Sequence, residues 1–512
     1  MGDVIGVTRT ARSATIKLAP MSDEPASDDH HRVVVVGAGF SGVALAIRLR
    51  RAGLDDLVIL EQEDDLGGTW YVNTYPGCQC DVPSLLYSLS FAPNPEWTRT
   101  FAPQPEIEAY LRNVADRYDV KRLIRFGTEL TGARWDDGTN RWIIDTPGGT
   151  VTADVLLLAT GFLSEPALPA IDGLDRFEGT VFHSARWRHD HDLAGERVAV
   201  IGTGASAVQF VPTIQPTVGR LTLFQRTAPW VLPRPDRPFT GRERWLYRRS
   251  ALAARLSRAR IYWTRELMVL MFAKYPGLAE FAARPARRHL EDQVPDPGLR
   301  EKLTPHYALG CKRVLLSNEY YPALGQPNVE VVTDSIDRVL PHAVVTTDGT
   351  EHPVDTIILG TGFEATEPPI ARRVRAADGR TMRQHWGDSA TAYLGTTVPG
   401  FPNLFFVVGP NTGLGHSSMI FMIESQANYI VDALKTMSAR NLAAVSVTPA
   451  VVDRFNEEIQ RQLSRSVWNT GCSSWYRDAS GRNTTLWPDF TWRFRRRTRH
   501  FDTDHYSVIR SS

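Results

Sequence analysis

The stretch Val33-Val34-Val35-Val36-Gly37-Ala38-Gly39-Phe40-Ser41-Gly42 decides the fold class of this chain. Four consecutive valines are typical of a strand that is buried on both faces of a parallel sheet. The glycines Gly37, Gly39 and Gly42 predict a tight turn, and residues 43–51 have helical periodicity. A strand, a glycine turn and a helix in this order begin a dinucleotide-binding βαβ unit, in which the helix N-terminus binds a pyrophosphate.

A second stretch of the same form runs from Val198 to Ala207. Gly202 and Gly204 occupy its turn, and Ala207 replaces the last glycine. One such motif is a weak signal, whereas two, each between a predicted strand and a predicted helix, are a strong one. At the start of the second helix, Ser206 and Gln209 are further candidate cofactor-binding residues.

An internal similarity extends this pattern. Residues 154–162 resemble residues 355–363, and each segment follows hairpin-like sequence with a glycine turn. Residues 241–308 are instead rich in Arg, Ala, Leu and Glu, with few turn signals, and they predict helices. The predicted fold is therefore α/β, with two Rossmann-like dinucleotide-binding domains, the second inserted in the first, and a helical insertion.

The residue after the second strand of each unit predicts which dinucleotide binds there. Glu61 ends that strand in the first unit, where a carboxylate accepts hydrogen bonds from a ribose diol and repels a 2′-phosphate. Arg226 and Thr227 stand there in the second unit, and a guanidinium with a hydroxyl suits a 2′-phosphate. The first site thus suits FAD or NAD and the second suits NADP(H), and FAD with NADPH on one chain implies hydride transfer to the flavin.

The predicted domain boundaries follow from these motifs. Residues 1–30 form a disordered N-terminal arm, and the helical insertion covers 236–308. The FAD-binding domain comprises 31–165 and 360–512, and the NADP-binding domain comprises 166–235 and 309–359.

Composition limits the possible partners and the cellular location. The chain has 512 residues and a formal net charge of +1, so we expect small-molecule partners and neither nucleic acid nor anionic lipid. Its four cysteines, Cys78, Cys80, Cys311 and Cys472, are too few for a disulfide scaffold and lack the spacing of a metal site or a dithiol redox pair. No apolar stretch is long enough for a secretory signal or an integral membrane span. These features predict a cytoplasmic protein without a metal, and they do not predict its oligomeric state.

Residues 177–187 carry a resemblance to a known family. They match the pattern F-x-G-x-x-x-H-x-x-x-W through Phe177, Gly179, His183 and Trp187. The chain here resembles the class B flavin-dependent monooxygenases, and Trp187 favours the Baeyer–Villiger monooxygenases among them. Arg188 is a departure, because Pro or Asp commonly follows in the family.

Further motifs resemble the same family. The pattern G-G-x-W-x-x-x-x-Y-P-G-x-x-x-D is present from Gly67 to Asp81, and the A-T-G-F element appears with Gly360 in place of Ala. The resemblance implies cofactor-binding roles for a set of residues that also includes the first-domain counterpart of that element: Gly68, Thr69, Trp70, Asp81, Thr160 and Gly161.

The resemblance also implies the catalytic residues. Lys312 would bind the NADP phosphate, Arg313 would face the flavin with Asp81 orienting it, and Trp475 would close over the nicotinamide. A permanent cation in a dry site stabilises a flavin peroxide anion that attacks a ketone. Structural roles remain open for several of these residues: His183 as an interdomain histidine, Asp81 as a helix N-cap, Arg313 as a surface cation, and Trp70 and Trp475 as core aromatics.

The predicted reaction is therefore insertion of one oxygen atom from O2 into a ketone, with FAD and NADPH. Three alternatives remain: an N- or S-oxygenating monooxygenase, a flavin disulfide reductase, and a flavin-binding protein without activity. The identity of the ketone is not predicted, because specificity depends on loops and on the insertion.

Overall fold

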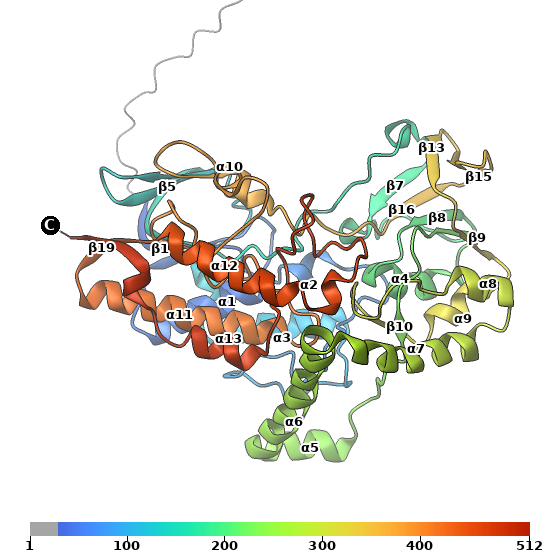
Figure 1. Ribbon diagram of the computed structural model, residues 1–512, viewed down its shortest axis with the longest axis horizontal. Coiled ribbons are helices and arrows are strands. Elements are labelled where there is room, and N and C mark those ends of the chain that lie inside the picture. The colour runs from blue at the N-terminus through green and yellow to red at the C-terminus, as the bar shows by residue number, and fades with distance from the viewer. Residues whose placement is uncertain (1–28, 512) are drawn as a thin grey trace, which may run out of the picture.

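The computed structural model describes residues 29–511 and forms two sheet-centred halves with a helical projection (Figure 1). Residues 1–28 of the predicted disordered arm lie outside the described residues, and His30 already begins the first strand. The sheets agree with the predicted α/β fold of two dinucleotide-binding units, while the exact domain boundaries stay a prediction. No helix among residues 29–511 combines the length and the apolar character that crossing a membrane requires.

The first sheet has eight strands in the order β17-β4-β5-β6-β1-β2-β3, with β18 against β6. Its centre is parallel, because β1 pairs in parallel with both β2 and β6. The four valines 33–36 of β1 are at most 7% exposed, as their unbroken apolar run predicts. The strands are β1 (His30–Val36), β2 (Leu57–Leu60), β3 (Ile124–Arg125), β4 (Gly132–Asp136), β5 (Arg141–Thr146), β6 (Gly149–Leu158), β17 (Val374–Arg375) and β18 (Leu404–Phe406).

The second sheet has five parallel strands in the order β12-β9-β8-β16-β7. These strands are β7 (Thr180–His183), β8 (Arg197–Ile201), β9 (Arg220–Phe224), β12 (Val329–Val332) and β16 (Thr356–Leu359). Smaller sheets contain β10 (Val231–Leu232), β11 (Leu315–Leu316), β13 (Ile336–Leu340), β14 (Ala343–Thr346), β15 (Glu351–Pro353), β19 (Leu442–Val447) and β20 (Tyr506–Arg510).

Helices cover both sheets and build the projection. In Figure 1, α1, α11 and α13 lie beneath the first sheet, α4 lies beside the second, and α5 and α6 extend away from the body. The α-helices are α1 (Phe40–Arg51), α2 (Thr69–Val72), α3 (Gln104–Arg117), α4 (Ala205–Ile214), α5 (Gly241–Arg249), α6 (Ala251–Val269), α7 (Ala279–Gln293), α8 (Pro297–Lys302), α9 (Tyr320–Leu324), α10 (Met382–Trp386), α11 (Met419–Ala439), α12 (Pro449–Leu463) and α13 (Thr491–Arg497).

Single turns complete the chain. A π-helical turn, η4 (Leu270–Lys274), continues α6. The 3₁₀ turns are η1 (Lys121–Leu123), η2 (Leu174–Arg176), η3 (Ser184–Arg186), η5 (Pro276–Leu278), η6 (Pro369–Arg372), η7 (Val467–Asn469) and η8 (Thr503–His505). Both glycine turns follow the carboxyl ends of central parallel strands, β1 and β8, which is the edge where such sheets bind ligands.

Candidate functional site

The first glycine turn leaves no room for a side chain. A Cβ at Gly42 would lie 1.9 Å from the carbonyl oxygen of Gly37, and a Cβ at Gly37 would lie 2.8 Å from that of Ala159. Gly37 also has a φ of +101°, which favours glycine. The helix N-terminus of α1 therefore stays bare, as the binding of a pyrophosphate requires.

Glu61 lies against this turn. Its carboxylate accepts hydrogen bonds from the backbone N–H groups of Ala38 (2.6 Å) and Glu63 (3.0 Å), and the residue is 5% exposed. Burial raises the pKa of Glu61, and the two backbone donors oppose that effect. The structure thus places Glu61 at the end of β2 beside the turn, where the sequence predicts a ribose-binding carboxylate.

A second pair of glycines packs directly on the first turn. A Cβ at Gly68 would lie 3.0 Å from the Cα of Gly39, and Gly68 has a φ of +54°. Thr69, exposed, begins α2 immediately afterwards, and the Trp70 indole N–H donates to the Tyr87 hydroxyl at 2.9 Å. The first glycine turn and the Gly67-Gly68 pair therefore form one small backbone surface. A planar or anionic ligand can approach this surface closely.

A small pocket lies beside the same turn. Thr160, Gly161 and Phe162 line one side, and residues 406–410 line another. The side-chain oxygens of Thr484 and Thr485, which also line it, are buried and have no hydrogen-bond partner among the described residues. Buried polar atoms without partners mark a place where a polar ligand completes the hydrogen bonding.

The second glycine turn explains two departures from the expected motifs at once. A Cβ at Gly202 would lie 2.4 Å from the carbonyl oxygen of Gly360, and a Cβ at Gly360 would lie 3.5 Å from the Cβ of Ala207. Ala207 replaces a glycine and Gly360 replaces an alanine, so the missing methyl group at one position faces the extra methyl group at the other. We infer that the turn keeps its packing despite both changes.

Arg226 and Lys312 approach each other near the second turn. Burial lowers the pKa of Lys312, and the positive charge of Arg226 lowers it further. Neither cation has an ion-pair partner within residues 29–511, and Lys312 instead lies 5.2 Å from the centre of the Tyr307 ring. Thr227 is anchored beside them, because the Thr203 hydroxyl donates to its carbonyl oxygen at 3.0 Å. Two neighbouring cations without an acid are unfavourable alone and fit a phosphate dianion.

Gln209 has a different partner from the one the sequence predicts. Its side-chain oxygen accepts from the Tyr75 hydroxyl (3.0 Å), and its amide N–H donates to the Gln79 carbonyl oxygen (3.0 Å). Ser206 also contacts Tyr75. A Cβ at Gly77 would lie 2.6 Å from the Gln209 carbonyl oxygen. The Tyr-Pro-Gly motif therefore packs on α4, and Gln209 joins the two nucleotide-binding units; its cofactor role stays a prediction.

Arg313 and Asp81 form an ion pair between the two units. Both Nε and Nη2 of Arg313 donate to the same oxygen of Asp81, at 2.8 Å and 2.5 Å. Burial raises the pKa of Asp81, but Arg313 outweighs burial and leaves this pKa below its ordinary value. Asp81 raises the pKa of Arg313 in return. Asp81 precedes no helix, so the structure does not support the N-cap alternative.

Two further arginines surround this pair, and sequence reasoning missed both. Arg234 is 5% exposed and donates to the Cys80 carbonyl oxygen at 3.0 Å, while its Nε and Nη1 have no partner in the described chain. Arg265 of α6 has its pKa lowered by burial, and Asp81 opposes this. Asp81 therefore interacts with three guanidinium groups, and the carboxylates of Asp236 and Glu319 also act on Arg234. No motif distinguishes these two from the many other arginines of the chain.

The residues of the 177–187 pattern pack within the second nucleotide-binding unit. A Cβ at Gly179 would lie 2.1 Å from the Asp355 carbonyl oxygen, so only glycine fits. Phe177 packs against the same position. The Trp187 ring lies 5.1 Å from that of Phe182 and 5.3 Å from that of Phe210 on α4. These contacts indicate a structural role for the pattern.

His183 and Arg188 complete this segment. His183 is 5% exposed, and its Nδ1 accepts from the Ala185 backbone N–H at 3.1 Å. Burial lowers the pKa of His183, which favours its neutral form, and its ring lies 5.8 Å from that of Phe363; the role of His183 stays a prediction. Arg188 points to solvent and pairs with Asp190 at 2.8 Å, so this departure from the family pattern lies outside the site.

Comparison with known proteins decides the family. A family model described as pyridine nucleotide-disulphide oxidoreductase matches residues 34–237. A Baeyer–Villiger monooxygenase of Streptomyces coelicolor is 52% identical, covering 96% of this chain and 95% of the relative. The chain belongs to the Baeyer–Villiger monooxygenase family. A second member, from Pseudomonas aeruginosa, is 50% identical over 94% of this chain and 92% of its own.

Solved structures of Baeyer–Villiger and related monooxygenases share the fold. The complex of OTEMO with FAD and NADP has a TM-score of 0.83 at 28% identity and covers 94% of this chain and 99% of that one. An oxidised steroid monooxygenase bound to NADP has a TM-score of 0.82 at 32% identity and covers 94% of this chain and 100% of that one. This Baeyer–Villiger monooxygenase is accordingly an FAD- and NADPH-dependent flavoprotein.

Trp475 and Tyr476 lie on a loop beside the arginine cluster of the Baeyer–Villiger monooxygenase. Trp475 is 38% exposed and stacks on Phe162, which lines the small pocket, with ring centres 6.0 Å apart. Tyr476 is 1% exposed; burial raises the pKa of its hydroxyl to about 12, and Arg313 opposes this rise. Trp475 is therefore no core aromatic, and Tyr476 is a neighbour of Arg313 that sequence reasoning missed.

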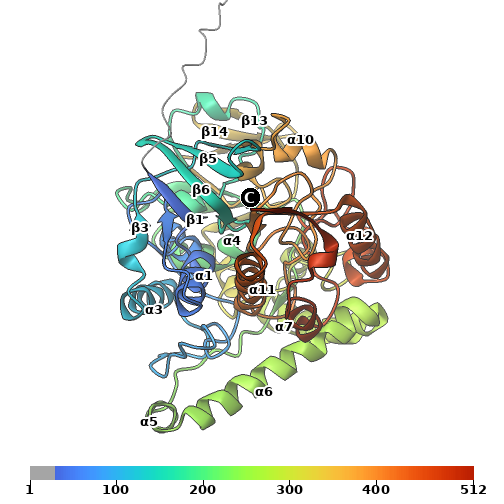
Figure 2. The same cartoon turned by 90° about the vertical axis from the view of Figure 1, so that its left-hand side faces the viewer.

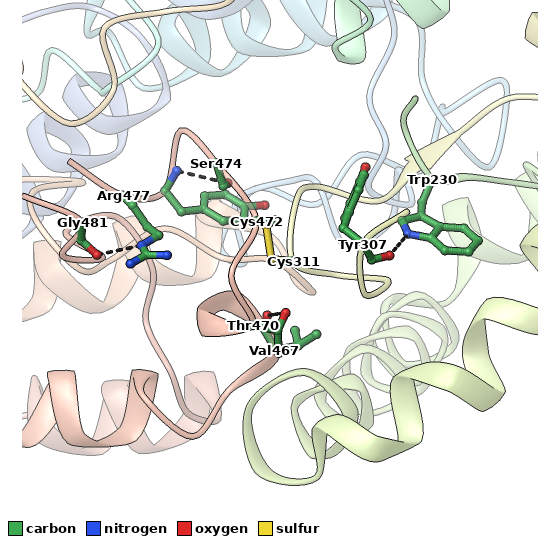
Figure 3. The surroundings of a disulfide bond; sticks show 10 residues. Trp230, Tyr307, Cys311, Val467, Thr470, Cys472, Ser474, Arg477 and Gly481 are labelled. Carbon is green, nitrogen blue, oxygen red and sulfur yellow. Dashed lines mark hydrogen bonds between the residues drawn. A yellow bond between two sulfur atoms is a disulfide. The ribbon is translucent and has the colours of Figure 1, made fainter. Parts of the chain in front are cut away.

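A disulfide between Cys311 and Cys472 ties this loop to the segment that contains Lys312 and Arg313 (Figure 3). Cys311 directly precedes Lys312 and Arg313, and Cys472 lies three residues before Trp475. Further bonds support the loop, including one from the Arg477 Nε to the Gly481 carbonyl oxygen at 2.7 Å. The small number of cysteines did not predict this bond, because pairing depends on proximity between residues 161 positions apart.

Breaking this disulfide is expected to destabilise the protein. The cross-link closes a loop of 161 residues, so the Cys472→Ser variant should lose about 2–4 kcal/mol of unfolding free energy, measured by denaturant titration of the oxidised protein. A reductant should destabilise the wild type equally and leave the variant unchanged. Denatured wild-type protein should titrate as two free thiols, and four thiols without reductant would contradict the bond.

Proposed function

We propose that this chain inserts one oxygen atom from O2 into a ketone to give an ester or a lactone, with Arg313 as the catalytic cation. The overall reaction consumes a ketone, O2, NADPH and H⁺ and yields the ester, NADP⁺ and water. The observation that carries the proposal is the Arg313–Asp81 ion pair, with Arg234 and Arg265 close by, between the two nucleotide-binding units.

The first glycine turn and its surroundings fit FAD. Gly37, Gly39 and Gly42 would admit the pyrophosphate, Glu61 would bind the ribose, and Gly68 would let the ring system approach. The residues at 160–161 with the unpartnered threonines would complete the site. When bound, the flavin supplies the electrons that activate O2.

The second turn and its cations fit NADPH. Gly202 and Gly204 would admit its pyrophosphate at the N-terminus of α4. Arg226 and Lys312, with the Thr227 hydroxyl, would bind the 2′-phosphate. The two cations are close enough to interact, and neither has an ion-pair partner in the described chain. We propose that Trp475, stacked on Phe162, shields the nicotinamide from water.

Arg313 would stabilise negative charge on the reacting oxygen atoms. Its charge persists at every physiological pH, because Asp81 raises its pKa still further. Asp81 uses one oxygen to hold both Nε and Nη2, which orients the guanidinium and leaves Nη1 for the substrate side. Arg234 and Arg265 would keep the site positive even though Asp81 offsets one charge.

Two other activities fit the structure less well. N- or S-oxygenation needs no cation to stabilise an anionic oxidant. It therefore does not account for the cluster of Arg313, Arg234 and Arg265. A disulfide reductase needs a reactive cysteine pair, but Cys78 and Cys80 are both buried, and burial raises the pKa of the Cys78 thiol to about 12. Such thiols are poor nucleophiles at neutral pH.

A product screen tests the proposal. The purified holoenzyme receives NADPH, O2 and, in separate reactions, a cyclic ketone, a linear ketone, a tertiary amine and a thioether. We expect products heavier by one oxygen atom from at least one ketone, with matching NADPH consumption. If the amine or the thioether is oxygenated and both ketones remain unreacted, the proposal is wrong and the chain is an N- or S-oxygenating monooxygenase. A cytosolic location stays part of the proposal.

A further inference from the structure

The helical insertion carries a row of large apolar side chains that the rest of the described chain does not cover. Leu252, Leu256, Trp263 and Leu267 of α6 are 67%, 62%, 56% and 62% exposed. Their spacing places them on one side of the helix, in a row about 22 Å long at 1.5 Å per residue. Soluble proteins rarely expose so continuous an apolar surface without a function.

Arginines border this row, and exposed acids are missing from it. Arg255 and Arg260 are exposed and fall on opposite sides of the row by helical periodicity. Neither has an ion-pair partner among the described residues. From 241 to 274 the sequence contains two acids: Glu243 is occupied by Arg237 at 2.7 Å, and Glu266 is 1% exposed.

The neighbouring helices extend the basic character. The Tyr262 hydroxyl of α6 lies 3.0 Å from that of Thr491, which begins α13. The next residue, Trp492, is 37% exposed and lines a groove between α1, α11 and α13. Asp432 is the sole acid among the lining residues of this groove, whose cationic members are Arg48, Arg51, Lys435, Arg495, Arg496 and Arg499.

We propose that this docking face, formed by the α6 row with Arg255 and Arg260 and by the adjoining groove, binds the surface of an anionic lipid bilayer. The leucines and Trp263 would enter the boundary between headgroups and acyl chains, and the arginines would bind lipid phosphates. An apolar centre with cationic borders is the arrangement of helices that lie in a membrane interface. The net charge of +1 conceals this local surface, so it does not argue against lipid binding.

The shape and charge of the docking face favour a bilayer over a protein. Helices α5 and α6 project from the body in Figure 1, and α6 lies at the outer edge in Figure 2, so a projecting helix carries the apolar row. A second copy using the same face would bring arginines against arginines, since the α6 row exposes no acid. An acidic protein partner would need a groove wide enough to enclose a projecting helix.

Vesicle flotation with the full-length holoenzyme tests the proposal. We expect binding to vesicles of phosphatidylcholine mixed with phosphatidylglycerol, weaker binding at high salt, and little binding to phosphatidylcholine alone. The L252S/L256S variant should lose binding, and R255E/R260E should weaken it about fivefold or more for each arginine removed. Leu168→Ser, at a residue that is 70% exposed elsewhere, is the matched control and should bind like the wild type.

Three outcomes would overturn the proposal. They are wild-type protein that does not float with the mixed vesicles, α6 variants that bind as well as the control, and a dimer in light scattering that L252S/L256S dissociates. The last outcome would assign the face to a second copy. NADPH oxidation by the variants in the absence of vesicles should equal that of the wild type, which excludes misfolding and keeps this test separate from the ketone reaction.

Discussion

Replacing Arg313 with alanine is expected to lower ketone oxygenation by about 10²–10³-fold, which corresponds to losing one preorganised charge. NADPH binding should persist, because the cations that we propose for its 2′-phosphate are Arg226 and Lys312. The variant should therefore still consume NADPH and release hydrogen peroxide. The measurement compares ester formed with NADPH consumed in single reactions.

Two companion variants separate charge from geometry. Arg313→Lys keeps a cation but loses the two-point contact with Asp81, so we expect intermediate activity. Asp81→Asn removes the counter-charge and should lower oxygenation less than Arg313→Ala does. Normal ketone turnover by Arg313→Ala would end the assignment of this residue as the catalytic cation.

Replacing Arg226 with alanine is expected to lower kcat/KM for NADPH by about 10–10²-fold, the usual contribution of a hydrogen bond between charged groups. The value for NADH should stay nearly constant, because NADH has no 2′-phosphate. Lys312→Ala should act in the same direction. The double variant should lose less transition-state free energy than the sum of the two single losses, because we propose that both cations bind the same phosphate.

Arg188→Ala is the matched control for these variants. Arg188 is an exposed cation paired with Asp190, outside the site, so its removal should change neither coenzyme preference nor ketone turnover. An unchanged ratio of NADPH to NADH efficiency in Arg226→Ala would contradict the 2′-phosphate role. Loss of activity in Arg188→Ala would instead show that this departure from the family pattern affects function.

Much of the site could be predicted from local sequence. The glycines 37, 42 and 202 are required by contacts of 1.9–2.8 Å that any side chain would violate, and such requirements leave a readable pattern. Glu61 and Arg226 each follow a strand at a fixed distance from a glycine turn, so their places were predictable too. The Arg313–Asp81 pair joins residues 232 positions apart and was accessible only through the family resemblance.

Other features have no local pattern. Arg234 and Arg265 come from a chain with many arginines, and Gln209 fits the motif equally well whether it binds a cofactor or a neighbouring loop. The Cys311–Cys472 disulfide requires two distant loops to meet, and a count of four cysteines argues against it. Covered and uncovered leucines look identical in sequence, so the docking face of α6 was also hidden.

The amino-acid sequence by itself determined the two nucleotide-binding units and predicts which dinucleotide each prefers, because backbone clearance and strand-end charge depend on residues close together in the chain. Only the tertiary structure decided which arginines gather around Asp81, which cysteines pair and which apolar side chains stay in solvent. Those properties depend on long-range packing, and packing is settled by shape and burial across the whole molecule.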